Sequence, residues 1–401
     1  MSPHVVPPAP PCAPESRPSP AGPTEAERLA RVALNRLAEP GDPRVGALVD
    51  ELGAERLHLL LRGEHQLGGL RDDLAARLDG CDPVRELEQA TRAGLRFLVP
   101  GDDEWPHRLD DLLHAPALHE RGGPPVGLWV RGPLRLDALE RSVALVGSRS
   151  ATSYGAQVAT DLAREVAAAG VAVVSGAAFG IDQAAHRGAL VGDGPTVAVL
   201  ACGADRVYPS AHRTLIDHLA RHGAVVSEAP PGDPPRRIRF LARNRLIAAL
   251  TGGTVVVEAA LRSGALNTAS WASRLHRPVL GVPGPVTSAA SQGVHLLLRR
   301  GEAVLVTSGE EVLEVVGLTG EHLLTEPRAP ATRRDRLTAR QRQVLDALPA
   351  TTAATTAAVA RAAGLGVLDV RADLARLQTA GLVGRDETGW RLAADADRPA
   401  R

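Results

Sequence analysis

The residue types best suited to chemistry in this 401-residue chain occur as short runs of glycine, hydroxyl side chains and arginine. The first run is Gly147, Ser148 and Arg149, and Thr152 and Ser153 follow it at the start of a predicted helix. Glycine lets backbone N–H groups approach an anion, and a guanidinium can bind phosphate through two parallel hydrogen bonds. The run therefore predicts a phosphate site, with a tight turn beside a solvated arginine as the alternative. It is not G-x-G-x-x-G and gives little support for dinucleotide binding.

A second run contains Ser175, Gly176 and Gly180 and again predicts a loop of exposed N–H groups. Asp182 and His186 follow at i,i+4 spacing on one helical face. Such a pair could act as a general acid and base. The alternative is structural, because an aspartate at this point often caps the helix and holds the histidine by a hydrogen bond.

The densest basic stretch lies at residues 236–245, which hold five arginines and no acidic residue. At helical spacing Arg236, Arg239 or Phe240, and Arg243 share one face. A cationic stripe with one aromatic ring suits a single-stranded backbone, because guanidinium groups bind phosphates and a ring can stack on a base. A solvated basic helix is the alternative.

Two further runs repeat the pattern. Arg206 follows another predicted strand, and Arg262, Ser263 and Gly264 come shortly after Glu258. Four successive predicted strands thus end in small, hydroxyl or arginine residues. Four such ends on one edge of a sheet indicate a polyanion or a nucleotide as the ligand.

The elements that must position these runs are short segments rich in valine and alanine, which alternate with amphipathic helical segments. The segments start every 24–30 residues, which is the length of a βαβ repeat, and both of their faces are apolar, as buried parallel strands require. The pattern predicts an α/β fold with a doubly wound, parallel, Rossmann-like sheet. The predicted strands are 142–146, 171–175, 196–201, 224–227, 254–258, 278–282 and 303–306.

The rest of the chain divides by composition. Nine prolines in the first 23 residues predict a disordered tail, and helical spacing from residue 24 predicts a small helical module. Three predicted helices and a hairpin near the C-terminus describe a winged helix. The expected domains are the tail 1–23, the helical module and lead-in 24–135, the Rossmann-like DNA-binding domain 136–317, the linker 318–335, the winged-helix domain 336–394 and the tail 395–401.

Composition excludes several classes of function. The charges of the 46 basic and 46 acidic residues cancel, which excludes a protein that binds nucleic acid through a basic surface over its whole length. The net charge does not exclude a local basic site. All 46 basic residues are arginine, which excludes a Walker A lysine, a Schiff-base lysine and a Ser-x-x-Lys pair. Cys12, Cys81 and Cys202 stand far apart and predict neither a disulfide nor a metal site, so no cofactor is expected. The sequence has no apolar run of membrane-span length and no leader pattern, which predicts a cytoplasmic protein without membrane contact.

An ordered set of motifs resembles the DprA/Smf family, whose members process incoming single-stranded DNA in bacteria. The resemblance spans about Thr24 to Leu392, and its specificity lies in the order of the motifs, since no single motif decides it. The motifs are GDDEWPHRL at 101–109, LWVRG at 128–132, VGSR at 146–149, SGAAFGID at 175–182, CGADRVYP at 202–209, SEAP at 227–230, RNRLIAAL at 243–250, RSGALNTA at 262–269 and VPG at 282–284.

The resemblance implies a binding protein and no catalytic activity. DprA-like chains coat single-stranded DNA as homodimers and load the RecA recombinase onto it during natural transformation. By position, Arg206 stands where the family commonly has a cation that reaches DNA, Arg243 and Arg245 belong to the RNR motif, and Phe179 stands at a variable position that is often arginine. The residues expected at DNA or phosphate are Gly147, Ser148, Arg149, Ser175, Gly176, Gly180, Arg206, Arg239, Arg243, Asn244, Arg245, Ser263 and Gly264.

Two other interpretations stay open. The fold also resembles the phosphoribohydrolases that act on nucleoside monophosphates, and residues 251–258 keep a Gly-Gly and Glu258 of their G-G-x-G-T-x-x-E motif but lose its second glycine–threonine step. The alternative function is therefore a nucleotide-processing enzyme. A transcription regulator would need tight duplex binding, against which acidic residues on the third helix and the wing argue: Asp369, Asp373, Asp386 and Glu387. Weak DNA contact and protein docking stay open as the two alternative roles of the winged helix.

Overall fold

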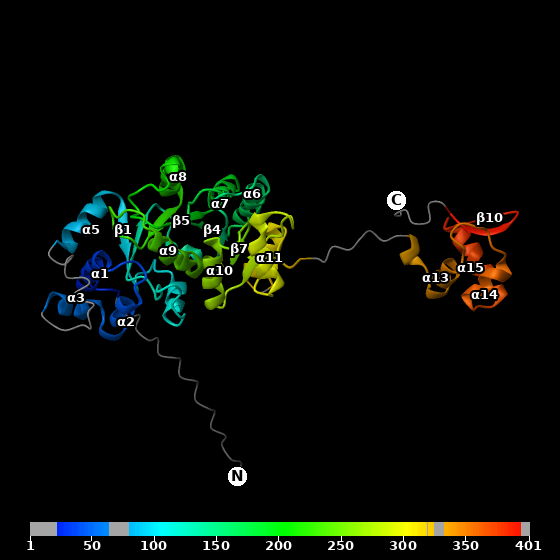
Figure 1. Ribbon diagram of the computed structural model, residues 1–401, viewed down its shortest axis with the longest axis horizontal. Coiled ribbons are helices and arrows are strands. Elements are labelled where there is room, and N and C mark those ends of the chain that lie inside the picture. Colours follow the sequence, from blue (N-terminus) through cyan, green and yellow to red (C-terminus); the bar gives the residue numbers. More distant parts are fainter. Residues whose placement is uncertain (1–21, 64–79, 319, 325–332, 394–401) are drawn as a thin grey trace, which may run out of the picture. The chain divides into compact units, whose positions relative to one another are not determined.

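The computed structural model describes residues 22–63, 80–318, 320–324 and 333–393, and the chain divides into two compact units at Leu324 (Figure 1). The expected tail 395–401 and most of the expected tail 1–23 lie outside the described residues, as does part of the expected linker 318–335. Among the described residues no helix is long and apolar enough to cross a membrane. Each unit is described by itself.

The first unit is built on one nine-stranded sheet with the order β1-β2-β6-β5-β4-β3-β7-β8-β9. The strands from β3 to β9 are mutually parallel and correspond to the seven predicted strands. The sheet also has two antiparallel strands at one end, β1 and β2, that the periodicity did not predict. The bounds are β1 Leu95–Leu98, β2 Leu128–Arg131, β3 Ser142–Val146, β4 Ala172–Ser175, β5 Thr196–Leu200, β6 Ala224–Ser227, β7 Thr254–Val256, β8 Val279–Gly281 and β9 Val304–Leu305.

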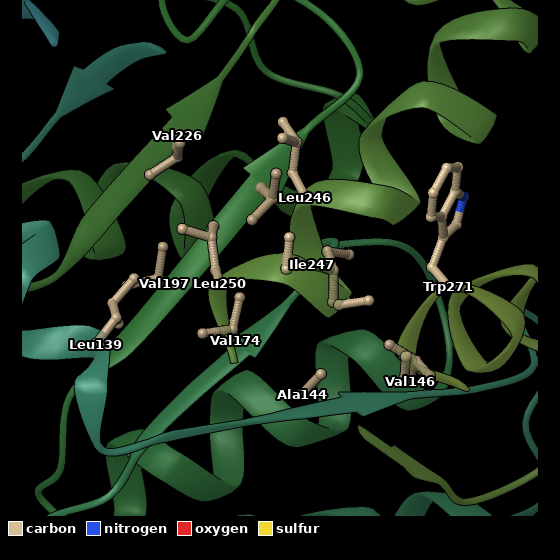
Figure 2. Packing of buried hydrophobic residues seen from close by; sticks show 14 of the residues in the cluster. Leu139, Ala144, Val146, Val174, Val197, Val226, Leu246, Ile247, Leu250 and Trp271 are labelled. Carbon is tan, nitrogen blue, oxygen red and sulfur yellow. The ribbon is translucent and has the colours of Figure 1, made fainter. Parts of the chain in front are cut away.

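The central strands are buried on both faces, as their continuous apolar sequences require. In β3 all five residues are buried, and alternate side chains enter different clusters because a strand has a side-chain period of two. Ala144 and Val146 pack on the face that Leu246 and Ile247 of α9 cover (Figure 2). Val143 and Leu145 of β3 pack on the opposite face.

Helices cover both faces of the sheet (Figure 1). One face packs against α9 (Arg237–Leu250), α10 (Ala265–Arg274) and α11 (Gln292–Arg299). The opposite face packs against α6 (Ser153–Ala168), α7 (Ile181–Val191) and α12 (Gly309–Val316), and nearer the antiparallel strands against α8 (Arg213–His222). Thr152 caps α6 by accepting a hydrogen bond from Gly155 N, which fixes the start of the helix directly after the β3 loop.

The N-terminal helices are part of this unit and pack on the antiparallel end of the sheet. They are α1 (Glu25–Leu37), α2 (Pro43–Leu52), α3 (Ala54–Arg62) and α5 (Pro83–Arg92). Asn35 of α1 accepts a hydrogen bond from Trp129 Nε1 at 2.8 Å and donates one to the Glu228 carbonyl at 2.7 Å. This buried amide ties α1 to β2 and to the end of β6.

The second unit contains three helices and a two-stranded antiparallel sheet. The elements are α13 (Ala339–Asp346), α14 (Thr356–Ala363), α15 (Val367–Thr379), β10 (Val383–Asp386) and β11 (Gly389–Leu392). Gly364 ends α14 with a left-handed φ of 67°, a conformation that glycine adopts readily and that turns the chain into α15. Val359, Leu374 and Trp390 belong to a core that this unit has to itself.

The order of the strands reverses beside β3, which has β4 on one side and β7 on the other. Ligands of doubly wound sheets bind at such a reversal, outside the carboxyl ends of the strands. Here the loops after β3 and β7 meet directly, because Ser148 N donates to the Glu258 carbonyl at 2.7 Å. The runs of glycine, hydroxyl and arginine residues therefore meet at this edge of the sheet.

Candidate nucleic-acid interface

A pocket of about 760 Å³ opens at this reversal point, between the loops that follow β3, β4 and β7 and the side of α9. Its rim residues are exposed and its floor residues are nearly buried. The rim residues include His119, Arg149, Ser150, Arg237, Arg262 and Gly264, and the floor residues include Val146, Asp182, Arg243, Asn244, Ile247 and Thr268.

Three arginines of the rim are available to a ligand. Arg149, Arg237 and Arg262 are exposed, and none of them forms an ion pair with a carboxylate of the described residues. Arg149 comes from the β3 loop, Arg237 from the first turn of α9 and Arg262 from the β7 loop. Because they come from three directions around one opening, an anion in the pocket would face positive charge on several sides.

Aromatic rings lie directly beside these arginines. The Arg149 guanidinium carbon lies 4.7 Å from the centre of the Phe240 ring, and the Tyr208 ring lies 5.7 Å from the same ring. These residues and Phe179 line a smaller, mostly apolar pocket of about 40 Å³ next to the large one. Phe179 and Tyr208 remain 47% and 42% exposed, so the rings have surface left on which a base could stack.

The loop glycines of the predicted phosphate runs serve first to bring two loops together. A Cβ on Gly147 would lie 2.5 Å from Ile181 Cγ1, and a Cβ on Gly180 would lie 2.3 Å from the Ser148 carbonyl. Gly180 also has a φ of 78°, which disfavours any other residue. Ile181 N donates to the Ser148 carbonyl at 3.1 Å across this contact. The glycines therefore set the position of Arg149, whether or not they touch a ligand.

Two of the expected phosphate contacts are buried and already have partners, which corrects the sequence analysis. Ser175 is fully buried, and its hydroxyl donates to the Leu145 carbonyl at 2.6 Å. Gly176 is also buried, and its N–H donates to the Asp182 carboxylate at 3.1 Å. These two residues position the loop from below, since neither presents a free donor to the pocket.

Asp182 and His186 do not form the expected pair. Asp182 accepts from the N–H groups of Gly176 and Ala178, at 3.1 and 3.4 Å, and burial raises the pKa of its carboxyl while Arg243 opposes that shift. His186 Nδ1 lies 2.7 Å from the Thr196 hydroxyl, and burial lowers the pKa of His186 to about 3. The histidine is a buried core residue, so neither the acid–base pair nor the predicted i,i+4 hydrogen bond is present.

The basic stretch of α9 is not the uniform cationic stripe that its local sequence predicts. Arg239 is 5% exposed and pairs with Glu39 at 2.8 Å and with Asp233 at 2.6 Å. Arg245 is fully buried and pairs with Glu228 at 2.6 Å. Arg236 also lies 3.8 Å from Glu39, and Arg243 lies 3.9 Å from Asp182. Arg239 and Arg245 lie away from the ligand pocket.

The other expected residues line the opening, except Arg206, which lines neither pocket. Asn244 lines the floor and donates to the Gly264 carbonyl at 3.3 Å and to Asn267 Oδ1 at 3.2 Å. The Ser263 hydroxyl accepts from Ala265 N at 3.3 Å, at the start of α10. Arg206 is exposed beyond the smaller pocket, where it donates to the Gly232 carbonyl.

Sequence reasoning missed His119, and it left Ser150, Arg237 and Arg262 off the list of expected contacts. His119 lies in a short hairpin closed by the Leu118–Arg121 bridge, and both His119 and Glu120 have positive φ values, 52° and 59°. This is the backbone of a type I′ turn, which glycine and asparagine normally occupy. No turn signal was therefore visible in the sequence, and the hairpin is far from the strand ends that the motif search followed.

The comparisons with known proteins identify a family. Residues 96–317 match the model of the family described as DNA recombination-mediator protein A. The chain belongs to this family. A relative from Mycobacterium tuberculosis, described as a DNA processing protein DprA, is 46% identical over 364 residues, which are 90% of this chain and 92% of the relative. The DNA processing protein DprA of Streptococcus pneumoniae is 40% identical over 216 residues, 53% of this chain and 71% of the relative.

A solved structure agrees with the fold. The X-ray structure of DprA from Streptococcus pneumoniae superposes with a TM-score of 0.59 at 30% sequence identity and covers 74% of this chain and 99% of that one. The DprA family match includes every loop around the pocket and ends before the second unit. The pocket described above therefore lies within the part of the chain that matches the DprA family.

Glu258, the residue on which a phosphoribohydrolase activity would depend, has a structural role in this DprA-family chain. Its carboxylate accepts from Thr152 N at 2.9 Å and from the Thr152 hydroxyl at 2.5 Å, and its side chain is 1% exposed. A Cβ on Gly155 would lie 2.3 Å from Glu258 Oε2, so the carboxylate packs against the first turn of α6. The described residues contain no group of three His, Cys, Asp or Glu side chains that could hold a metal ion.

Proposed function

We propose that this protein binds single-stranded DNA across the carboxyl edge of its sheet and acts there as a recombination mediator. The observation that carries the proposal is the pairing of exposed arginines without carboxylate partners, Arg149 and Arg262 among them, with the exposed rings of Phe179 and Tyr208. Phosphates would lie on the guanidinium groups and unpaired bases on the rings.

This arrangement favours a single strand over a duplex. A ring can stack on a base only where the face of the base is free, and in a duplex both faces are covered by neighbouring base pairs. The small pocket between Phe240, Tyr208 and Phe179 is apolar and lies beside Arg149. A strand with unstacked bases can use both features at once.

We extend the proposal to the function that the family description states. A mediator places a recombinase on single-stranded DNA, and we propose that this chain loads RecA, acts as a homodimer in the cytoplasm, and works by binding without catalysing a reaction. Family membership and the resemblance of the motifs support these points. RecA filament formation on strands coated with single-strand-binding protein should accelerate with the wild type and not with Arg149→Ala.

We also propose that residues 336–394 form a winged-helix domain, which adds a weak DNA contact. The other proposed domains are the Rossmann-like DNA-binding domain 136–317 and the helical module 24–135. Residues 333–393 contain ten arginines and six acidic residues. Asp373 was expected on the exposed face of the third helix, but it is 1% exposed and accepts from Arg340 at 2.6 Å. The outer face of α15 therefore has less negative charge than its sequence suggests. Arg371, which is exposed on α15, is a suitable site for a test by substitution with alanine.

The experiment is a fluorescence anisotropy titration with a labelled oligothymidine of about 20 nucleotides and with a duplex of equal length. The wild type should prefer the single strand, and Arg149→Ala should weaken that binding about tenfold, as expected for loss of a charge-assisted contact. Arg92→Ala is the matched control, because Arg92 is 73% exposed on α5 and lies outside the pocket. Equal affinity for both DNA forms, unchanged in Arg149→Ala, would refute the proposal.

The alternative function, a nucleotide-processing enzyme of the phosphoribohydrolase type, has weaker support. The pocket has a suitable size for a nucleotide, but Glu258 is occupied by the cap of α6. Release of a base from a nucleoside monophosphate, lost in Glu258→Gln, would favour the enzyme over the mediator.

A further inference from the structure

The floor of the pocket holds a buried cation whose hydrogen-bonding capacity is mostly unused. Arg243 is 6% exposed. Its Nη1 donates to the Val199 carbonyl at 3.3 Å and lies 3.9 Å from Asp182 Oδ2, and its Nε has no partner. A guanidinium has five N–H donors, and buried donors without acceptors are costly. A residue in this state at the floor of an open pocket indicates an acceptor that is brought by a ligand.

The surroundings of Arg243 add further donors. Asn244 is 8% exposed on the same floor, and the Nδ2 of its partner Asn267 is buried without an acceptor. Gly264 is the N-cap of the ten-residue helix α10 and also lines the pocket. The N-terminus of a helix carries partial positive charge, although the N–H groups of Ala265, Leu266 and Asn267 already have acceptors. Arg243, Asn244 and Gly264 line one pocket.

The charge balance of the pocket favours a dianion. Arg149, Arg237 and Arg262 on the rim and Arg243 on the floor face one acidic side chain among the lining residues, Asp182. The Asp182 carboxylate is itself engaged by two backbone N–H groups. A phosphate monoester carries a charge of about −1.5 to −2 at pH 7, whereas a phosphodiester within a strand carries −1.

The burial of Arg243 at the floor of the pocket also favours a phosphate monoester. A phosphodiester in the middle of a strand has a sugar on both sides, so the strand must fold back on itself for that phosphate to reach a buried floor. A terminal phosphate has a sugar on one side only and can reach buried floor residues end-on. The exposed rim arginines suit passing diesters, whereas buried Arg243 suits a phosphate that enters.

We propose that the floor of this pocket binds a terminal phosphate, a phosphate monoester carried by the end of a DNA strand or by a free nucleotide. The inference rests on the proposed function, in that the rest of the strand would lie on the rim arginines. Arg243 would donate to the phosphate oxygens, and the start of α10 would face the same group.

The test compares oligothymidines of one length, about 20 nucleotides, with an internal dye and either a 5′-phosphate, a 3′-phosphate or hydroxyl groups at both ends. One phosphorylated form should bind the wild-type protein about tenfold more tightly than the hydroxyl form. Thymidine monophosphate should compete for the pocket, and thymidine should not. A preference for a phosphorylated end without competition by the nucleotide would identify the strand end as the source, and the reverse would identify a free nucleotide.

Equal binding of all three strands, together with no effect of thymidine monophosphate on DNA binding or on the melting temperature, would overturn the inference and leave the proposed function standing. No binding of any strand would refute the proposed function, and the melting temperature with the nucleotide would still test the phosphate site. Arg243→Lys should reduce the preference for phosphate, with Arg92→Ala as control. If Arg243→Lys does not fold, the comparison of strands on the wild type decides the question alone.

Discussion

The buried ion pair of Arg245 and Glu228 allows a test of whether an arginine of α9 stabilises the fold or binds DNA. Arg245 is fully buried in α9, and its Nη2 lies 2.6 Å from Glu228 Oε1. The same oxygen accepts from Gly41 N at 3.1 Å, so the pair joins α9, the end of β6 and the loop after α1. We predict that Arg245→Met destabilises the first unit and leaves the DNA-binding surface chemically intact.

The magnitude follows from burial. Removing one partner of a buried ion pair leaves the other charge without compensation, which costs about 3–5 kcal/mol. Glu228 would keep one N–H donor, from Gly41, while its Oε2 already lacks a partner. Replacing both residues in Arg245→Met/Glu228→Leu removes the uncompensated charge, so the double variant should recover most of the lost stability.

The assay is urea unfolding followed by tryptophan fluorescence, in which buried Trp129 reports on the contact between α1 and β2. The reasoning requires a lower free energy of unfolding for Arg245→Met, recovery in the double variant, and near-native affinity for oligothymidine while the protein is folded. Unchanged stability with a loss of DNA affinity as large as that of Arg149→Ala would refute it, because Arg245 would then be a DNA contact.

Two further predictions concern the residues beneath the pocket. Because burial lowers the pKa of His186 to about 3, the native imidazole stays neutral where the unfolded one gains a proton below its ordinary value of about 6.5. The contribution of His186 to the free energy of unfolding should therefore be lost as the pH falls from about 6.5 towards 3, by up to about 1.4 kcal/mol per pH unit. With falling pH, the urea midpoint of His186→Gln should decrease less steeply than that of the wild type. Gly176→Ala should lower the free energy of unfolding by about 1–3 kcal/mol and weaken DNA binding, because the new Cβ would lie 1.2 Å from Arg243 Nη1. Gly46→Ala in α2, where no atom lies within 4 Å of the new Cβ, should keep or slightly raise stability, and an equal loss in both variants would contradict the packing argument.

The parallel sheet could be predicted from the sequence because its signals are local. A buried strand such as β3 is a continuous apolar run, and the spacing of such runs fixes the βαβ repeat. The antiparallel strands β1 and β2 were missed, since β1 pairs with β2 and β2 joins the sheet through β6, about a hundred residues further along the chain. Sequence periodicity carries no information on such long-range pairing.

The candidate site was predicted in outline and not in detail, for a similar reason. Arg149 and Gly264 could be placed at the carboxyl edge because each follows a predicted strand. Arg239 was placed with them because residues 236–245 hold no acidic residue, yet Asp233 pairs with it, and so does Glu39, two hundred residues away. Which arginines stay free for a ligand is decided by tertiary contacts, and only the structure separates Arg237 from its buried neighbours.

The most direct test of the central claim is to locate a bound single strand on the protein. An oligothymidine that carries 5-iododeoxyuridine can be cross-linked by light to aromatic side chains it stacks on, and mass spectrometry identifies the attached peptide. We predict cross-links in peptides that contain Phe179, Tyr208 or Phe240, reduced in Arg149→Ala and unchanged in Arg92→Ala. Cross-links confined to residues away from the carboxyl edge of the sheet would contradict the account.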